Sequence, residues 1–217
     1  MSFVMYAHPF SSYSQKAKTA FYEKGVPFTE IVLDGGEEVM AEFTGLWPVG
    51  KFPMVVDDGE VVFDATAIIE RLEARTPGAP NLIPSDALAA AEVRMWDRFF
   101  DNYVSYPQQR LVYRVLGREP DEGLDGAPWK AALDTAYEIL DRRMDGREWA
   151  CGDFSLADCA AAPALLYADW SHPIPKRCSN LWAYRDRLLA RPSYARALDE
   201  ARPYRHFFPL GAPEGRD

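Results

Sequence analysis

The sequence has little cysteine, no long apolar run and no targeting segment. Its 217 residues include three cysteines, Cys151, Cys159 and Cys178, and this sparse, odd number argues against a disulfide framework and for a reducing compartment. No segment approaches the roughly 18 apolar residues of a membrane span. The apolar start stops at His8, too early for the apolar region of a signal peptide. We therefore expect a cytoplasmic protein with no membrane partner.

Basic charge and metal-ligand clusters are also scarce. The chain has 24 Lys and Arg against 33 Asp and Glu, a net charge of −9, so it lacks the basic footprint of a nucleic-acid-binding protein. Its histidines, His8, His172 and His206, lie far apart with no Cys or carboxylate at ligand spacing, and we predict no metal site. The remaining composition, 48% hydrophobic and 26% charged, is ordinary for a folded chain and excludes intrinsic disorder.

Two parts of the chain differ in their pattern. Residues 1–77 alternate between short apolar strands and helices, whereas residues 85–217 show helical patterns and no convincing strand. Two prolines and a glycine within residues 77–80 prevent a helix from continuing between them. We predict an α/β domain at 1–77, a linker at 78–84 and an all-helical domain at 85–217.

The first domain is predicted to have the order β-α-β-α-β-β-α. Apolar and alternating runs predict four strands, at 3–7, 28–33, 54–56 and 61–63. Helical spacing of apolar residues predicts three helices, at 12–24, 37–43 and 65–74. A four-stranded mixed sheet with flanking helices is the simplest way to bury these apolar faces.

The second domain is predicted to be a helical bundle. Its helices are expected at 85–116, 129–144, 156–168, 180–190 and 193–201. The first should bend at Pro107, because proline removes an intrahelical hydrogen bond. The third is almost wholly apolar and should be central. The aromatic residues of the tail 202–210 suggest that it packs back on the body.

The segment from His8 to Lys16 joins the first predicted strand to the first predicted helix. Free backbone N–H groups and the positive end of the helix dipole meet there. A serine hydroxyl in this turn can donate to a thiolate, and the same field lowers the pKa of a bound thiol. The alternative is purely structural, with Ser11 or Ser12 serving only as the helix N-cap.

Two further segments have both a functional and a structural interpretation. If the bond between Phe52 and Pro53 is cis, the Phe52 backbone can pair with an extended peptide; otherwise the proline simply ends a loop. Asp64 opens a predicted helix, where it can hold an amino group while the free N–H of Ala65 holds a carboxylate, or act only as a cap.

A capping-box spacing joins Ser155 to Asp158, although Asp replaces the usual Glu or Gln. We assign no chemistry to this pair. From the cap alone we expect Asp158→Ala to destabilise the fold by ~1 kcal/mol.

Taken together, these segments resemble the cytosolic glutathione transferase family over nearly the whole chain. The resemblance rests on Ser11-Ser12-Tyr13-Ser14-Gln15-Lys16, Gly50-Lys51-Phe52-Pro53, Asp64-Ala65-Thr66-Ala67-Ile68-Ile69-Glu70 and Phe154-Ser155-Leu156-Ala157-Asp158. It implies a thioredoxin-like first domain followed by an all-helical second. The serine pair before a basic helix is most similar to serine-type classes such as zeta and theta.

The resemblance also implies a substrate and roles for particular residues. Glutathione would be the co-substrate, and Ser11, or Ser12 by a one-residue slip, would donate to its sulfur. Its cysteinyl part would pair with the backbone of Phe52 before a cis Pro53, and its glycyl end would approach Lys51. Its γ-glutamyl end would meet Asp64 and the Ala65 N–H. A small hydrophobic electrophile would lie between the domains against Tyr103 and Tyr106, in a protein that is typically a homodimer.

Two departures from the family pattern bear on these expectations. Asp64-Ala65 stands where the family has Glu or Gln followed by Ser, which removes one hydrogen bond to the γ-glutamyl carboxylate. Phe52 replaces the commoner small aliphatic residue, which matters little because its role is through the backbone. In addition, no cysteine precedes Cys151, which disfavours disulfide-reductase chemistry. The sequence therefore supports two hypotheses. The first is an enzyme that conjugates glutathione to an electrophile or isomerises it; the second is a non-catalytic dimeric scaffold of the same fold.

Overall fold

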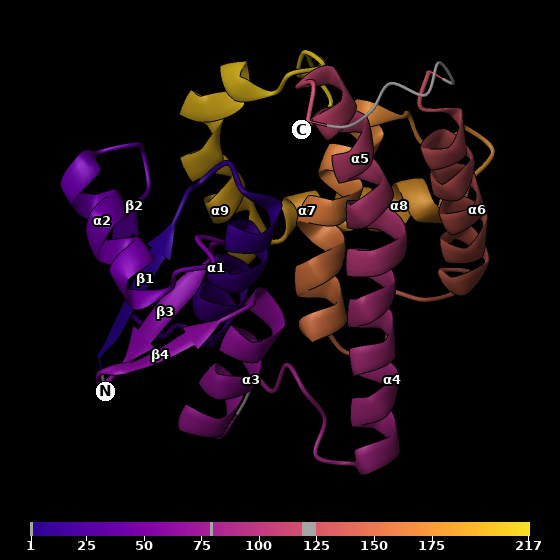
Figure 1. Ribbon diagram of the computed structural model, residues 1–217. Coiled ribbons are helices and arrows are strands. Elements are labelled where there is room, and N and C mark those ends of the chain that lie inside the picture. The colour runs from indigo at the N-terminus through magenta and orange to yellow at the C-terminus, as the bar shows by residue number, and fades with distance from the viewer. Residues whose placement is uncertain (1, 79, 119–124) are drawn as a thin grey trace.

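The computed structural model describes residues 2–78, 80–118 and 125–217 (Figure 1). A four-stranded sheet in the order β2-β1-β3-β4 forms the centre of the first part. Its strands are β1 (Phe3–Ala7), β2 (Thr29–Val32), β3 (Met54–Asp57) and β4 (Glu60–Phe63). Strand β2 runs parallel to β1, whereas β3 and β4 continue the sheet in antiparallel fashion. The predicted mixed sheet is therefore confirmed.

Helices cover both faces of this sheet. On one face lie α1 (Ser12–Lys24) and α3 (Ala65–Arg75), which pack against each other, while α2 (Glu37–Leu46) covers a small apolar cluster of Tyr6, Leu33, Phe43 and Met54. The predicted first helix is confirmed at both ends, because Ser11 caps its start and Gly25, at φ 63°, adopts the left-handed conformation that ends it. The second extends three residues beyond the predicted 37–43, to Leu46.

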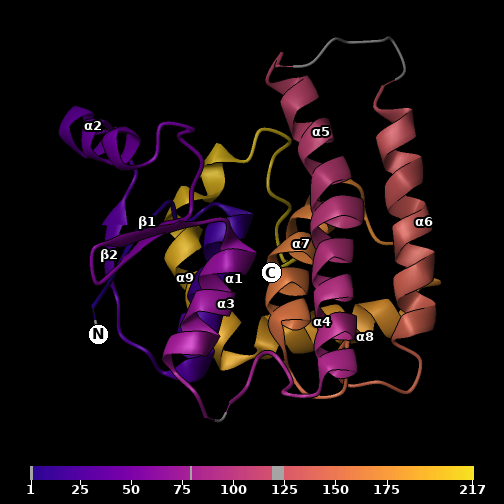
Figure 2. The ribbon, with the colours of Figure 1, turned by 60° about the horizontal axis from the view of Figure 1, so that its bottom comes forward.

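The second part of the chain is helical. It contains α4 (Ala87–Phe99), α5 (Tyr106–Val115), α6 (Ala127–Arg143), α7 (Leu156–Ser171), α8 (Ser179–Ala190) and α9 (Pro192–Ala201). As predicted, α7 is central: every residue from Leu156 to Trp170 is buried, and the helix contacts α1, α4, α5 and α8. Figure 2 shows α5 and α6 side by side at the outer edge of the bundle. Among the described residues after 84, pairing of β type is limited to two isolated bridges.

The long helix predicted at 85–116 is interrupted earlier than expected. A π-helical segment, Phe100–Ser105, separates α4 from α5, so the break begins ahead of Pro107. Proline has no N–H to donate, and the preceding turn widens, so that the Tyr106 N–H bonds to the Asp101 carbonyl five residues back. Wide turns of this kind occur frequently at functional sites.

The C-terminal tail packs back on the body, as its aromatic residues suggested. After a 3-10 helix at Arg202–Phe207, the Phe208 ring is buried against Phe10, Tyr167 and Trp170. The predicted linker at 78–84 includes residue 79, which lies outside the described residues, and the domain boundaries remain a prediction.

Candidate active site

Three of the predicted site segments leave the sheet at the same end. In the strand register Tyr6 pairs with Met54, and Met54 pairs with Phe63. Ser11 follows β1, Pro53 precedes β3 and Asp64 follows β4, so all three segments emerge side by side. With neighbouring strands about 4.8 Å apart, the backbones at these strand ends lie within about 10 Å of one another.

The turn before α1 presents unpaired donors. The Ser11 hydroxyl accepts the Ser14 N–H at 3.3 Å, and the Ser11 N–H bonds to the His8 carbonyl at 2.9 Å. Within the described parts of the chain, the N–H groups of Ser12 and Tyr13 make no hydrogen bond. The turn therefore directs free N–H groups and the positive end of the helix dipole outward, beside two half-buried serine hydroxyls.

A buried glutamine holds this turn in place. The Gln15 amide donates to the Pro9 carbonyl at 3.0 Å and to the Tyr167 hydroxyl at 2.8 Å, and Tyr167 in turn donates to the Phe10 carbonyl at 2.9 Å. Tyr194 of α9 donates to the other end of the Gln15 amide at 3.0 Å. Because these side chains are buried, the turn is tied to α7 and α9 and keeps its donors in one arrangement.

The bond between Phe52 and Pro53 is cis. Pro53 is buried at the start of β3, whereas Phe52 is 36% exposed and Lys51 is exposed. Among the described residues Lys51 has no ion-pair partner. Its ammonium is therefore available to an anionic ligand at this end of the sheet.

Asp64 adopts an unusual conformation at the start of α3. Its φ of 72° lies in the left-handed region that non-glycine residues seldom occupy. One carboxylate oxygen, Oδ1, accepts the N–H groups of Thr66 at 2.9 Å and Ala67 at 3.4 Å. In the described structure Oδ2 of Asp64 and the N–H of Ala65 have no hydrogen-bond partner. The cap interpretation is therefore correct, and it leaves one acceptor and one donor free.

Sequence patterns missed a cluster of buried charges beside this helix start. Lys16, only 1% exposed, pairs with Asp97 at 2.6 Å and with Asp101 at 2.8 Å, and donates to Thr66 Oγ1 at 2.9 Å. The cluster joins α1, α3, α4 and the π-helical segment. Burial raises the pKa of Asp101, an effect that Lys16 opposes. The one signal available in the sequence was Lys16, which lies on the same face of α1 as Ala17 and Ala20. A charged side chain on an apolar helix face is buried only when it is paired with an opposite charge, so Lys16 indicated an acidic partner.

Two models of the glutathione S-transferase family match the chain. Its N-terminal domain model matches residues 5–80, and its C-terminal domain model matches residues 86–187. "Protein LigF" from Sphingobium sp. is 33% identical, over 93% of this chain and 95% of the relative. The chain belongs to the glutathione S-transferase family. It is accordingly a glutathione-dependent transferase or isomerase.

Other comparisons agree with this membership. A maleylacetoacetate isomerase from Rattus norvegicus is 28% identical, over 76% of this chain and 78% of the relative. The crystal structure of a glutathione S-transferase from Rhodospirillum rubrum F11 superimposes with a TM-score of 0.81 at 25% identity, covering 99% of this chain and 97% of the other. The thioredoxin-like first part and helical second part are those of a glutathione S-transferase.

The two predicted cleft tyrosines of this transferase are exposed. Tyr103 lies in the π-helical segment, 59% exposed, and its ring contacts Phe99 at 5.3 Å. Tyr106 begins α5, 48% exposed, with its ring against Trp129 at 5.8 Å. Their position on the bend is as predicted, whereas their role toward a substrate remains a prediction.

The tail of the transferase adds residues that were not predicted near the site. Tyr204 and Phe207 pack on the His8 ring at centroid distances of 4.8 and 6.2 Å, at the start of the turn that leads to Ser11. Burial lowers the pKa of His8, and its Nδ1 accepts the Phe10 N–H at 3.1 Å. The tail therefore supports the outer side of the Ser11 turn.

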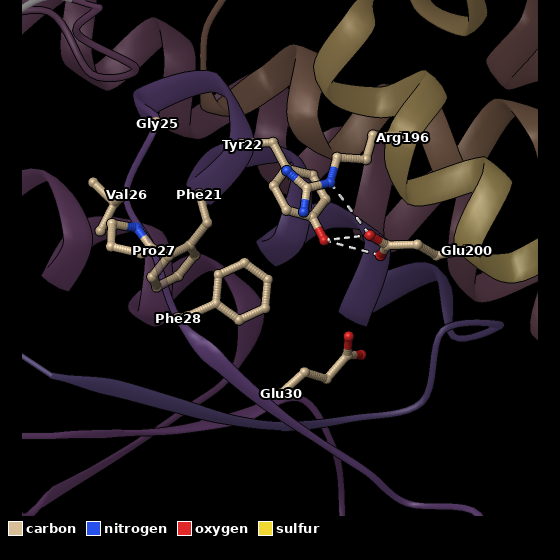
Figure 3. Close-up of a pocket in the computed structure, with 9 residues that line it drawn as sticks. All are labelled: Phe21, Tyr22, Gly25, Val26, Pro27, Phe28, Glu30, Arg196 and Glu200. Carbon is tan, nitrogen blue, oxygen red and sulfur yellow. Dashed lines mark hydrogen bonds and ion pairs between the residues drawn. The ribbon is translucent and has the colours of Figure 1, made fainter.

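A pocket of about 420 Å³ lies away from this site (Figure 3). It is formed by the C-terminal end of α1, the loop that follows, and α9; Tyr22 donates there to Glu200 at 2.7 Å beneath the guanidinium of Arg196. Tyr22 is ten residues beyond Ser12 on α1, or about 15 Å at the rise of a helix. The pocket is therefore distinct from the Ser11 turn.

The transferase's own thiols are poorly suited to chemistry. Cys159 and Cys178 are buried, and burial raises the pKa of both; burial also raises the pKa of the half-buried Cys151 to about 12. We expect the native protein to react slowly with iodoacetamide at pH 8, and all three thiols to react once it is unfolded in urea, as counted by intact mass. Rapid modification of the native protein would contradict these environments.

Residues 2–78, 80–118 and 125–217 contain neither a group of three or more side chains placed to hold a metal ion nor a helix with the length and apolar character to cross a membrane.

Proposed function

We propose that this protein transfers glutathione to, or uses it to isomerise, a small hydrophobic electrophile, by way of a glutathione thiolate held at the Ser11 turn. The observation that carries the proposal is the convergence of the Ser11 turn, the Phe52–Pro53 bond and the Asp64 helix start at one end of the sheet. The isomerase alternative draws support from the maleylacetoacetate isomerase relative.

The proposed binding mode uses groups that the fold leaves unpaired. Asp64 Oδ2 takes the γ-glutamyl amino group, and the Ala65 N–H takes the γ-glutamyl carboxylate. The Phe52 backbone pairs with the cysteinyl part as an added strand would, and Lys51 takes the glycyl carboxylate. Because glutathione and the protein are both net negative, with −9 on the chain, binding depends on these local donors and not on long-range attraction.

The chemical step requires a thiolate. A free thiol has a pKa near ~8.5, so little glutathione is ionised at neutral pH. The Ser11 O–H proton has no acceptor among the described residues and donates to the sulfur, with Ser12 as the alternative donor. A hydrogen bond to a charged group stabilises it by about 1.5–3 kcal/mol, which lowers the thiol pKa by about 1–2 units. The thiol proton leaves to water, and the sulfur attacks the electrophilic carbon. In conjugation by substitution the leaving group departs as an anion with the bonding pair; in addition to a double bond that pair moves to the neighbouring carbon, which water protonates. In isomerisation the pair returns after rotation about the carbon–carbon bond and expels the sulfur as the thiolate.

The remaining parts of the proposal concern the surroundings of the site. Tyr103 and Tyr106, on the bend between α4 and α5, contact the electrophile. The protein acts as a homodimer in the cytoplasm and belongs to a serine-type class similar to zeta or theta. The domain boundaries stay at 1–77 and 85–217.

Calorimetric titration with glutathione tests the proposal. We expect binding in the millimolar to sub-millimolar range, about −4 to −6 kcal/mol, accompanied by a rise in the unfolding temperature. Cysteinylglycine, which lacks the γ-glutamyl residue, should bind more weakly because Asp64 and Ala65 then have no partner. No heat and no thermal shift at ~10 mM glutathione, a generous excess over such an affinity, would contradict the proposal.

One observation favours the scaffold alternative. Ala65 supplies no hydroxyl to the γ-glutamyl carboxylate, a loss that costs about tenfold in affinity. The two hypotheses differ in turnover: a scaffold would show no conjugation of 1-chloro-2,4-dinitrobenzene above the rate in buffer, whereas the enzyme would.

A further inference from the structure

Arg98 reaches from α4 across to the first turn of α3. Its Nη2 contacts Thr66 Oγ1, two residues after Asp64, and lies 2.7 Å from Asp97 Oδ2 and 2.5 Å from Asp101 Oδ2. Asp64 lies close enough to stabilise the Arg98 charge. The guanidinium therefore lies at the first turn of α3, at the residue that follows Ala65.

Two carboxylates hold this guanidinium by one side only. Nε donates to Asp97 at 3.0 Å and Nη2 makes the contacts just described, whereas Nη1 has no partner among the described residues. The Arg98 side chain is 43% exposed. A guanidinium held by Nε and Nη2 in this way has its orientation already set, and the two N–H groups of Nη1 are left for a ligand.

The buried charges beneath Arg98 balance its positive charge but leave its Nη1 donors without a partner among the described residues. Asp97 and Asp101 are also paired with Lys16, which is 1% exposed. Two carboxylates and two cations give a neutral cluster, to which Asp64 adds one negative charge. The cluster therefore carries no surplus positive charge, and what Arg98 offers a ligand is the hydrogen-bond donors of Nη1.

A purely structural role explains only part of this geometry. Lys16 already joins α1 to α3, α4 and the π-helical segment through buried contacts. Arg94, one turn earlier on α4, joins α4 to α3 through Glu70 at 2.6 and 3.0 Å. The Nη1 group of Arg98, which has no partner among the described residues, adds nothing to these links.

We propose that Arg98 determines the specificity of the site for the γ-glutamyl residue, with Nη1 donating to its α-carboxylate beside the Ala65 N–H. This inference rests on the proposed function. It assigns to a guanidinium from the helical domain the hydrogen bond that Ala65 cannot make, so that the carboxylate is bound from α3 and α4 together.

The test uses glutathione and an analogue that lacks only this carboxylate, 4-aminobutanoyl-cysteinylglycine. By calorimetry the wild-type protein should bind glutathione about tenfold more tightly than the analogue. Arg98→Gln should weaken glutathione binding about tenfold and leave the analogue unchanged within about twofold. Arg98→Lys keeps a positive charge but lacks the planar, forked N–H groups of a guanidinium. It should recover part of the preference for glutathione over the analogue.

Arg94→Gln is the matched control, because it removes another arginine that bridges α4 to α3. It should leave both affinities unchanged. Retention of full discrimination by Arg98→Gln and Arg98→Lys would overturn the inference, as would an equal loss of affinity for both ligands. Failure of the wild-type protein to bind glutathione at all would overturn the proposed function together with this inference.

Discussion

Replacement of Ser11 by alanine is expected to lower kcat for glutathione conjugation about 100-fold, the typical effect of removing one donor to a developing or stabilised anion. The hydroxyl lies at the start of α1. Without it, the glutathione thiolate would have only the free N–H groups of Ser12 and Tyr13 as donors there. Without Ser11 the pKa of the bound thiol should rise by about 1 unit or more. The ultraviolet absorbance of the thiolate, followed against pH in the glutathione complex, measures that shift directly.

Ser12→Ala is the matched variant, since the two hydroxyls are adjacent and both half-buried. Ser11 also caps α1 through its bond from the Ser14 N–H, so Ser11→Ala should cost ~1 kcal/mol of stability that Ser12→Ala does not. Unfolding midpoints therefore separate the structural effect from the catalytic one. Full activity of Ser11→Ala, with the loss appearing in Ser12→Ala instead, would transfer the donor role to Ser12.

Asp158→Ala is expected to destabilise the protein by about 4 kcal/mol, well above the ~1 kcal/mol of a lost cap. The carboxylate is fully buried at the start of α7 and accepts four hydrogen bonds. Oδ2 accepts the N–H and hydroxyl of Ser155, and Oδ1 accepts the Ala150 N–H at 2.9 Å and the Tyr184 hydroxyl at 2.6 Å. Alanine would leave these donors buried without partners, each at a cost of about 1–3 kcal/mol before relaxation.

Urea unfolding monitored by fluorescence measures this loss. Tyr184→Phe removes a single one of the four bonds and should cost about 1 kcal/mol. Asp158→Asn has the same shape but turns an NH₂ group toward donors, so it should fall between the other two. A midpoint for Asp158→Ala close to that of Tyr184→Phe would mean that the cap alone accounts for the role of this residue.

The difference between the two expectations for Asp158 shows where sequence reasoning ends. The spacing of Ser155 and Asp158 predicted a capping box, and both of its bonds are present. The bonds to Ala150 and Tyr184 come from a loop before the helix and from α8, and no local spacing contains them. Local patterns predict local hydrogen bonds, and only the packing of separate elements reveals the others.

The same distinction between local and long-range contacts explains which helices and strands were predicted correctly. β1 and α1 lie at the predicted residues because an apolar run, a serine cap and Gly25 act within a few residues of each other. The break between α4 and α5 was misplaced because the sequence shows where Pro107 lies, whereas the extent of the π-helical turn ahead of it, which packs against α7, is visible only in the structure.

By itself, the sequence determined the order of strands and helices, the cap at Ser11 and the helix start at Asp64. The spacing of these motifs also indicated membership of the glutathione transferase family. These features depend on backbone conformation and on neighbouring side chains, which a linear pattern records. Tertiary structure alone decided that Lys16, Asp97 and Arg98 meet at the start of α3. Burial of a charge is favourable only when partners from other helices surround it, and those partners are distant in the sequence.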